Sequence, residues 1–150
     1  MPFPIVPLPI VPLPIFPLPI FISSIDRDRT RINVGLKGGT WKRPDGTLLA
    51  NIVAGVGGEL GYIDINQVFH MEFTYAVQFV EDNKWGYVHG KGFSTPTEPP
   101  KTFYTLESDS VAAKGLTEQT LYASGQFKGE LLDATNYAFV GAEGAESGLL

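Results

Sequence analysis

The residues best suited to chemistry lie in two neighbouring runs of alternating polar and apolar residues. A carboxylic acid beside an imidazole or a phenol can exchange protons with a substrate without a cofactor, and a lysine can stabilise a developing negative charge. We predict such a catalytic acid–base site from Glu72, His89, Tyr87 and Lys91. Side chains that could hold the ligand by hydrogen bonds or stacking lie in the same two runs: Trp85, Gln78, Thr74 and His70.

The two runs indicate two β-strands joined by a tight turn. From residue 69 to 79 every odd residue is apolar and most even residues are polar, which is the period of a strand with one buried face. The polar residues 81–84 suit a hairpin turn, and the second run covers 85–93. A turn centred on Asp82 and Asn83 predicts the cross-strand pairs Val80 with Trp85, Gln78 with Tyr87, Ala76 with His89 and Thr74 with Lys91.

This predicted hairpin has one apolar face and one mixed face. On the apolar face large side chains meet glycines, which suits a curved barrel wall because glycine permits the bend; the residues are Phe73, Tyr75 and Phe79 against Gly86, Gly90 and Gly92. The mixed face carries all eight predicted site residues. It is either a surface in contact with solvent or another subunit, as in most antiparallel sheets, or the wall of a ligand cavity.

No metal or cofactor is predicted. In the predicted register His70 lies about 20 Å from His89 at the usual rise of a strand, whereas zinc ligands lie about 2 Å from one ion. The chain has no cysteine, which excludes disulfides, thiolate nucleophiles and cysteine-based metal sites. The glycine-rich residues 55–61 have neither the spacing of a nucleotide-binding loop nor a helical pattern after them, and we interpret them as a barrel corner.

The composition favours a single intracellular domain that does not bind nucleic acid. The chain has 150 residues, enough for one core. Its formal net charge is −5, and its one basic cluster, residues 27–31, is interleaved with aspartates, whereas phosphate contacts need clustered lysine and arginine. The absence of cysteines and of a glycosylation sequon favours a cytoplasmic location.

The first 22 residues form a five-residue repeat with proline at every second or third position. Prolines at this spacing break a helix, and no basic start or cleavage site is present, so neither a signal peptide nor membrane contact is expected. We predict an extended, polyproline II arm over residues 1–22 and a β-barrel domain over residues 23–150. The arm either packs along its own barrel or a sister subunit, is disordered, or serves as a recognition ligand for another protein.

Further alternating runs bring the count to about eight strands with turn signals at roughly ten-residue spacing. The strand signals cover residues 31–41, with a break at Gly38-Gly39, and residues 48–56, 101–107, 120–127 and 136–142. Residues 61–67 indicate a short strand or loop, Pro44-Asp45-Gly46 a turn, and 108–119 a short helix or irregular loop. We predict an all-β fold, an antiparallel β-barrel of calycin or lipocalin type.

The order of several motifs resembles a known family. Gly38-Gly39-Thr40-Trp41, the Pro-Asp-Gly turn, the glycine-rich corner and the run Trp85-Gly-Tyr-Val-His-Gly-Lys-Gly are similar to the small bacterial and fungal β-barrels of domain-of-unknown-function family 3237. Phe103-Tyr104-Thr105 and residues 136–141 are similar to the closing segments of that family. The resemblance implies a calycin-like antiparallel barrel, and it implies no settled reaction and no catalytic residues.

Two functions of different classes follow from these observations. The first is a barrel that binds a small apolar or aromatic molecule and extends to a cofactor-free isomerase or cyclase that uses tuned acid and base groups. The second is a structural role, in which the proline-rich arm mediates oligomerisation and the mixed face of the hairpin is an interface. We expect a homo-oligomer.

Overall fold

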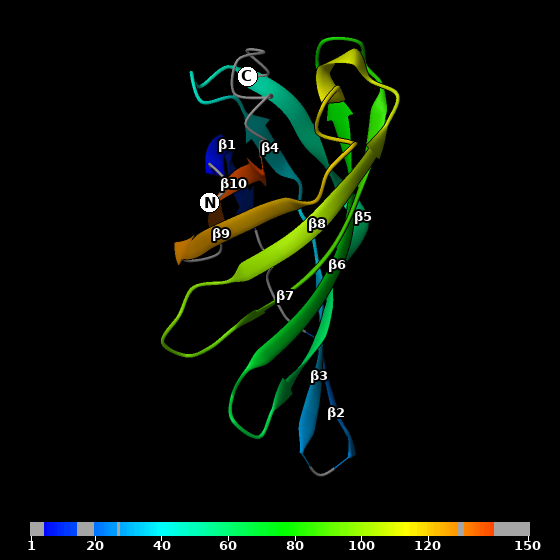
Figure 1. Cartoon of the computed structure of the whole chain (residues 1–150). Helices are drawn as coiled ribbons and strands as arrows, with labels where there is room; N and C mark the ends of the chain where they lie inside the picture. Colours follow the sequence, from blue (N-terminus) through cyan, green and yellow to red (C-terminus); the bar gives the residue numbers. More distant parts are fainter. Residues whose placement is uncertain (1–4, 15–19, 27, 129–130, 140–150) are drawn as a thin grey trace.

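The structure, a computed structural model, describes residues 5–14, 20–26, 28–128 and 131–139. These residues form one antiparallel, ten-stranded sheet that curves around a single core (Figure 1). The strands are β1 (Ile5–Pro14), β2 (Ile20–Asp26), β3 (Arg29–Gly35), β4 (Gly39–Lys42), β5 (Leu48–Asp64), β6 (Phe69–Phe79), β7 (Trp85–Ser94), β8 (Lys101–Ser108), β9 (Leu121–Lys128) and β10 (Leu131–Phe139). Their order in the sheet is β1-β10-β9-β8-β7-β6-β5-β3-β2, and β4 pairs with the first part of β5.

The all-β antiparallel prediction is confirmed, with ten strands in place of about eight. Within the described ranges the hydrogen-bond ladder does not close into a ring, although β4 lies beside β1. β1 occupies one edge of the sheet and is paired with β10. Proline is tolerated on an edge strand because it has no N–H to donate to a ladder. The division into an arm over 1–22 and a barrel over 23–150 stays a prediction.

The β6–β7 hairpin has the predicted faces but a different register. Gln78, not Val80, lies opposite Trp85, and Thr74 lies opposite His89, so every predicted pair is wrong by two residues. The turn is longer than predicted, because the Phe79 N–H donates to the Lys84 carbonyl (2.9 Å) and residues 80–83 form the loop. Because the shift is even, the two faces are unchanged.

β5 contains an irregularity that reverses its faces. Residues 53–56 stand opposite the single residue Ala76 of β6, so β5 carries three extra residues there. Gly55 and Gly57 have φ of +74° and +80°, a conformation that glycine adopts at little cost. An odd insertion exchanges the inward and outward residues of a strand. Ile52 is therefore buried before the bulge, and Glu59 is buried after it while Leu60 is exposed.

The interior is filled at the end near the β6–β7 turn. The largest fully buried side chains come from β6 to β9 and meet there: Phe79, Leu106, Leu121, Val77 and Val88. The short 3₁₀-helix η1 (Val111–Ala113) adds Ala113, which is fully buried in the same cluster.

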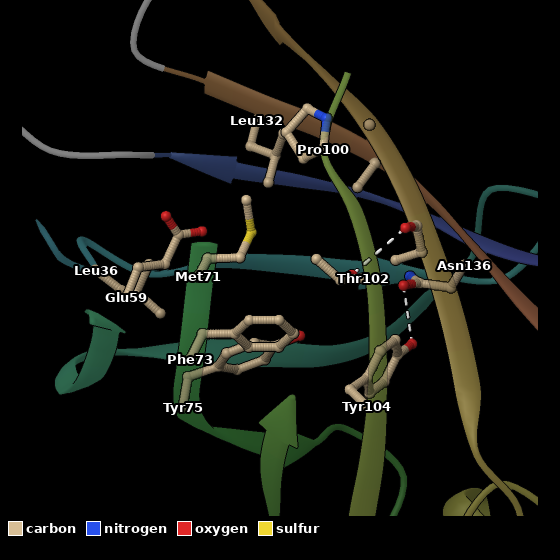
Figure 2. Close-up of a pocket in the computed structure, with 13 residues that line it drawn as sticks. Leu36, Glu59, Met71, Phe73, Tyr75, Pro100, Thr102, Tyr104, Leu132 and Asn136 are labelled. Carbon is tan, nitrogen blue, oxygen red and sulfur yellow. Dashed lines mark hydrogen bonds between the residues drawn. The ribbon is translucent and has the colours of Figure 1, made fainter. Parts of the chain in front are cut away.

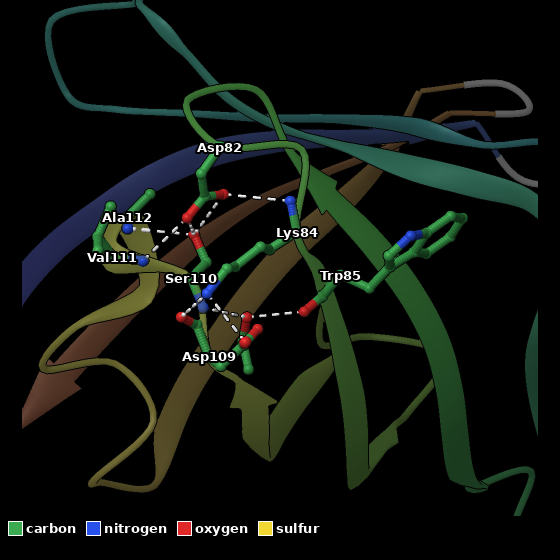
Figure 3. Close-up of polar contacts among 8 residues, drawn as sticks. Asp82, Lys84, Trp85, Asp109, Ser110, Val111 and Ala112 are labelled. Atoms are coloured by element: carbon green, nitrogen blue, oxygen red, sulfur yellow. Dashed lines mark hydrogen bonds and ion pairs between the residues drawn. The ribbon is translucent and has the colours of Figure 1, made fainter.

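A polar network holds η1 to the β6–β7 turn (Figure 3). The carboxylate of Asp82 accepts hydrogen bonds from the Ser110 hydroxyl (2.9 and 3.0 Å) and from the Val111 N–H (3.0 Å). The ammonium group of Lys84 binds the Asp109 carboxylate (2.9 Å). These contacts join two loops that are distant in sequence, and so they keep this end of the interior closed.

Other predicted boundaries move for local reasons. The strand predicted over 31–41 is divided into β3 and β4 near the predicted break at Gly38-Gly39, where Gly38 has φ of +103°, and β3 begins two residues earlier, at Arg29. The segments predicted over 48–56 and 61–67 belong to the single strand β5, and β10 begins at Leu131, before the predicted start at 136. The predicted turn at 44–46 is confirmed, with the Arg43 N–H bonded to the Thr47 carbonyl (2.8 Å). Among the described residues no helix has the length and apolarity needed to cross a bilayer.

Candidate functional site

The concave face of the sheet forms a cavity at the end opposite the β6–β7 turn (Figure 2). Its wall is mostly apolar and consists of Leu36, Glu59, Met71, Phe73, Tyr75, Pro100, Thr102, Tyr104, Ala123, Gly125, Leu132, Ala134 and Asn136. The cavity volume is about 40 Å³, and the empty space reaches about 560 Å³ when the part open to solvent is included. Ligand pockets usually hold about 300–1,000 Å³. The inner part therefore accommodates one group of a ligand, and the remainder would lie in the mouth.

Within the described part of the chain, Glu59 is the only acid in the cavity wall. The β5 bulge turns it inward, where it lies opposite Phe73 of β6. Its side chain is buried, and no hydrogen bond or ion pair to it is found among the described residues. Burial raises the pKa of Glu59 from its usual 4.5 to about 7, because the charged form loses its hydration. Near neutral pH this carboxyl group can therefore either donate or accept a proton.

The opposite wall carries neutral hydrogen-bonding groups. The buried Tyr104 hydroxyl donates to Oδ1 of Asn136 (2.8 Å), and the Thr102 hydroxyl donates to the Ala123 carbonyl (3.4 Å). Figure 2 shows these groups across the cavity from Glu59. Burial raises the pKa of Tyr104 well above its usual value, so this phenol stays protonated.

An aromatic cluster supports this part of the wall. Phe73 is stacked on Tyr75 (centroid distance 6.0 Å), and Trp41 meets Tyr75 edge-on (6.3 Å). Burial raises the pKa of Tyr75, and the nearby indole N–H of Trp41 offsets this only in part. The two groups do not reach hydrogen-bond geometry. The buried Nε1–H of Trp41 thus has no acceptor within the part of the chain that the structure describes.

The structure brings Glu72 and His89 together on the outer, convex face. Nε2 of His89 lies 3.1 Å from Oε1 of Glu72, and their side chains are 44% and 51% exposed. The hydrogen bond with His89 and the charge of Lys91, which lies opposite Glu72, hold the pKa of Glu72 below its usual value. Glu72 is consequently ionised at neutral pH and in contact with water.

The other predicted site residues share this outer face. Tyr87 and Trp85 are exposed, and Gln78 donates from Nε2 to the Asn83 carbonyl (3.2 Å). Nε2 of His70 lies 2.9 Å from Oδ2 of Asp64. Thr74 is half-buried opposite His89, and none of the eight residues lines the cavity. Their catalytic and ligand-binding roles stay a prediction, for a surface distinct from the cavity.

The histidines and acids of the outer face do not form a metal centre. In the observed register His70 lies opposite Phe93, four residues from His89 along β7, or about 13 Å at the usual strand rise. Across the described ranges no three acidic, histidine or cysteine side chains converge.

Sequence reasoning missed the polar groups of the cavity for two different reasons. Tyr104 and Thr102 alternate with Phe103 in β8, and this period does indicate that they share a face. Asn136 is the first residue of the strand predicted over 136–142, and the alternation there puts it on one face with Ala138 without marking that face as the inner one. Glu59 has no periodic signal at all, because the bulge before it reverses the alternation of β5.

Comparisons with known proteins bear on the fold alone. No family model matches the sequence, and no curated protein matches it. A Clostridium acetobutylicum protein of unknown function has a similar structure, with a TM-score of 0.78 and 15% identity, over 91% of this chain and 99% of that one. A β-barrel-like protein of Acinetobacter baumannii has a TM-score of 0.75 and 17% identity, over 92% and 98%. An enzyme of Penicillium herquei has a TM-score of 0.70 and 14% identity, over 91% and 96%.

Proposed function

We propose that this protein binds a small, mainly apolar or aromatic molecule in the inner cavity, and that Glu59 acts there as an acid or base in a cofactor-free isomerisation or cyclisation. The observation that carries the proposal is a buried carboxyl group, unpaired among the described residues, in an apolar cavity that reaches solvent. A site of this kind, apolar with a few convergent polar groups and one perturbed acid, is the usual setting of a ligand site.

The chemistry suits a proton transfer. An acid whose pKa of about 7 lies close to the working pH is populated in both protonation states. The neighbouring phenols stay neutral and can orient a ligand by hydrogen bonds. A ligand group held against the aromatic wall would displace water from the reacting end, which would strengthen each polar contact made there.

We also propose that the sheet is a closed barrel of calycin type and that the chain belongs with the family 3237 barrels that its motifs resemble. The barrel-like neighbour supports the first of these at the level of the fold. The proximity of β4 and β1 is consistent with closure along that seam.

The test is a compound screen followed by turnover assays on three proteins: the wild type, Glu59→Gln and Glu72→Gln. Small apolar and aromatic compounds that raise the melting temperature of the wild type would be incubated with each protein, and isomeric products followed by chromatography. We expect Glu59→Gln to bind a hit but not convert it, and Glu72→Gln to behave like the wild type. Conversion that survives in Glu59→Gln and is lost in Glu72→Gln would move the active site to the outer face.

A further inference from the structure

The few hydrogen-bonding groups in the described part of the cavity wall are neutral or acidic, and none is a cation. Among the residues that the structure describes, the wall contains no lysine, arginine or histidine. The positive charges near it lie on the convex face, where Lys91 is exposed opposite Glu72 and where Arg29 and Arg31 lie over the ring of Tyr62 (4.9 and 5.5 Å). A carboxylate or phosphate ligand would therefore enter an apolar space with no partner for its charge, which is costly.

Glu59 supplies a hydrogen-bond donor that the described protein residues leave unused. A protonated carboxyl group has one O–H to donate, and no acceptor for it is found among the described residues. A buried donor without a partner costs free energy that a ligand acceptor can recover. The group that fits against Glu59 is therefore an acceptor without a negative charge, such as a carbonyl oxygen.

On the opposite wall the phenol of Tyr104 has already used its donor. The Tyr104 hydroxyl gives its proton to Asn136, so its oxygen is left as an acceptor toward the cavity. A ligand hydroxyl or N–H could donate to it. The two groups are therefore complementary: the protonated Glu59 carboxyl is a hydrogen-bond donor, and the Tyr104 oxygen is an acceptor.

Resting on the proposed function, we propose that the cavity selects neutral molecules that carry a carbonyl on an apolar body, with the carbonyl oxygen against Glu59, and that it rejects carboxylates and phosphates. The selection is made by the donor of Glu59 and by the absence of any cation in the wall. A hydroxyl or N–H group on the far side of the ligand would be favoured by Tyr104.

The protonation of Glu59 makes this selection depend on pH. The titratable groups that face it are the phenols of Tyr75 on β6 and Tyr104 on β8, and burial keeps both neutral. The lining residues of β9 and β10 contain no titratable group, and neither does the sequence of β1. Lys37, beside the lining residue Leu36, is exposed. As the pH rises through about 7, the donor of Glu59 is therefore replaced by an unpaired carboxylate, which favours a cation over a carbonyl.

Met71 provides a local reporter for the test. Its side chain lines the cavity, and Figure 2 shows it beside the Glu59 carboxyl group. The chain has only two methionines, so a protein labelled with ¹³C at the methionine methyl gives a resonance that is assigned by a Met71→Leu control. Titration would follow this resonance with four probes of similar size: acetophenone, benzoate, benzylammonium and ethylbenzene.

At about pH 6 we expect acetophenone to bind at least about tenfold more tightly than benzoate and ethylbenzene. At about pH 8.5 we expect the affinity for acetophenone to fall and that for benzylammonium to rise. Glu59→Gln, which keeps an N–H donor, should retain acetophenone binding at both pH values, and Glu59→Leu should bind acetophenone no better than ethylbenzene. The pH comparison on the wild type needs no variant to fold.

Two results would overturn the inference and leave the proposed function standing: benzoate that binds at the Met71 end as tightly as acetophenone, or ethylbenzene that does so at both pH values. A Met71 resonance that responds to none of the four probes would instead remove the support for a ligand site in this cavity. The failure of the ligand class and the failure of the site are therefore separate outcomes.

Discussion

Glu59 and Glu72 lie on neighbouring strands, on opposite faces of one sheet. Glu72 is about half exposed, is paired with His89 and has a lowered pKa. Glu59 is buried, is unpaired among the described residues and has a raised pKa. The two environments shift the pKa values of these glutamates in opposite directions, although the residue type is the same.

An acid with a visible partner is therefore a weaker functional candidate here than an acid with none among the described residues. The Glu72–His89 pair is hydrated and already satisfied, so it gains little from a ligand. Glu59 loses hydration and has nothing in exchange, and this imbalance is what a bound molecule can correct. The alternation of polar and apolar residues in β6 and β7 points to the Glu72–His89 pair. It does not point to Glu59, because the bulge in β5 interrupts the alternation before that residue.

The largest expected effect comes from the contrast between adjacent residues on the two faces of β7. A methyl group added at Gly90 would overlap the Phe73 ring and lie 2.6 Å from Cβ of Tyr104. Gly90→Ala should therefore destabilise the fold by about 3 kcal/mol, measured by urea unfolding. His89→Ala, one residue away on the outer face, should leave the midpoint close to that of the wild type. Equal effects of the two substitutions would mean that the faces are assigned incorrectly.

The next effect concerns stability and pH. Because folding raises the pKa of Glu59 from 4.5 to about 7, the folded state binds its proton more tightly than the unfolded chain does. Below about pH 4.5 the ionisation of Glu59 does not reduce the free energy of unfolding. As the pH rises from about 4.5 to about 7, this free energy falls by about 3 kcal/mol in all. Glu59→Gln should remove this slope and be the more stable protein at about pH 8.

Glu72→Gln is the matched control for that measurement. Since the pKa of Glu72 is lowered, its contribution has the opposite sign: it stabilises the fold above its unfolded pKa and is lost as the pH falls through the folded value. We expect a small change confined to acid pH. Stability of Glu59→Gln that still declines between about pH 5 and pH 7 would show that another group titrates there.

A smaller effect is expected from single hydroxyl groups. Tyr104→Phe removes the buried hydrogen bond to Asn136 and should cost about 1–2 kcal/mol. Tyr122→Phe is the control, because its half-buried hydroxyl has no hydrogen bond among the residues that the structure describes. Thermal unfolding of the two variants should differ clearly, and coincident curves would argue against the Tyr104–Asn136 contact.

The smallest effect is expected for ligand binding after substitution of the outer pair. Glu72→Gln and His89→Asn should leave the response of the Met71 methyl to acetophenone unchanged, since neither residue lines the cavity. A loss of binding in either variant would contradict this expectation and make the outer face a candidate ligand site.

The sequence predicts the sheet well and the site poorly, for identifiable physical reasons. The alternation in β6 to β8 reveals strands, their inward faces and the glycines that allow close packing, because a regular strand repeats every two residues. The hairpin register is off by two because the loop length depends on the φ of +58° at Asn83, which composition does not reveal. The burial of Glu59 depends on three extra residues in β5. They count as extra only against the pairing with β6, which the sequence of β5 alone does not reveal.

The bulge in β5 also has an evolutionary consequence. Removing or adding one residue within 53–56 would exchange the faces of the strand beyond it, so that Leu60 would enter the interior and Glu59 would reach water. A lineage could therefore acquire or discard the interior acid by a single insertion or deletion, with no substitution in the lining. Among proteins with this sheet architecture, variation in the length of the β5 bulge would be a sensitive marker of altered chemistry.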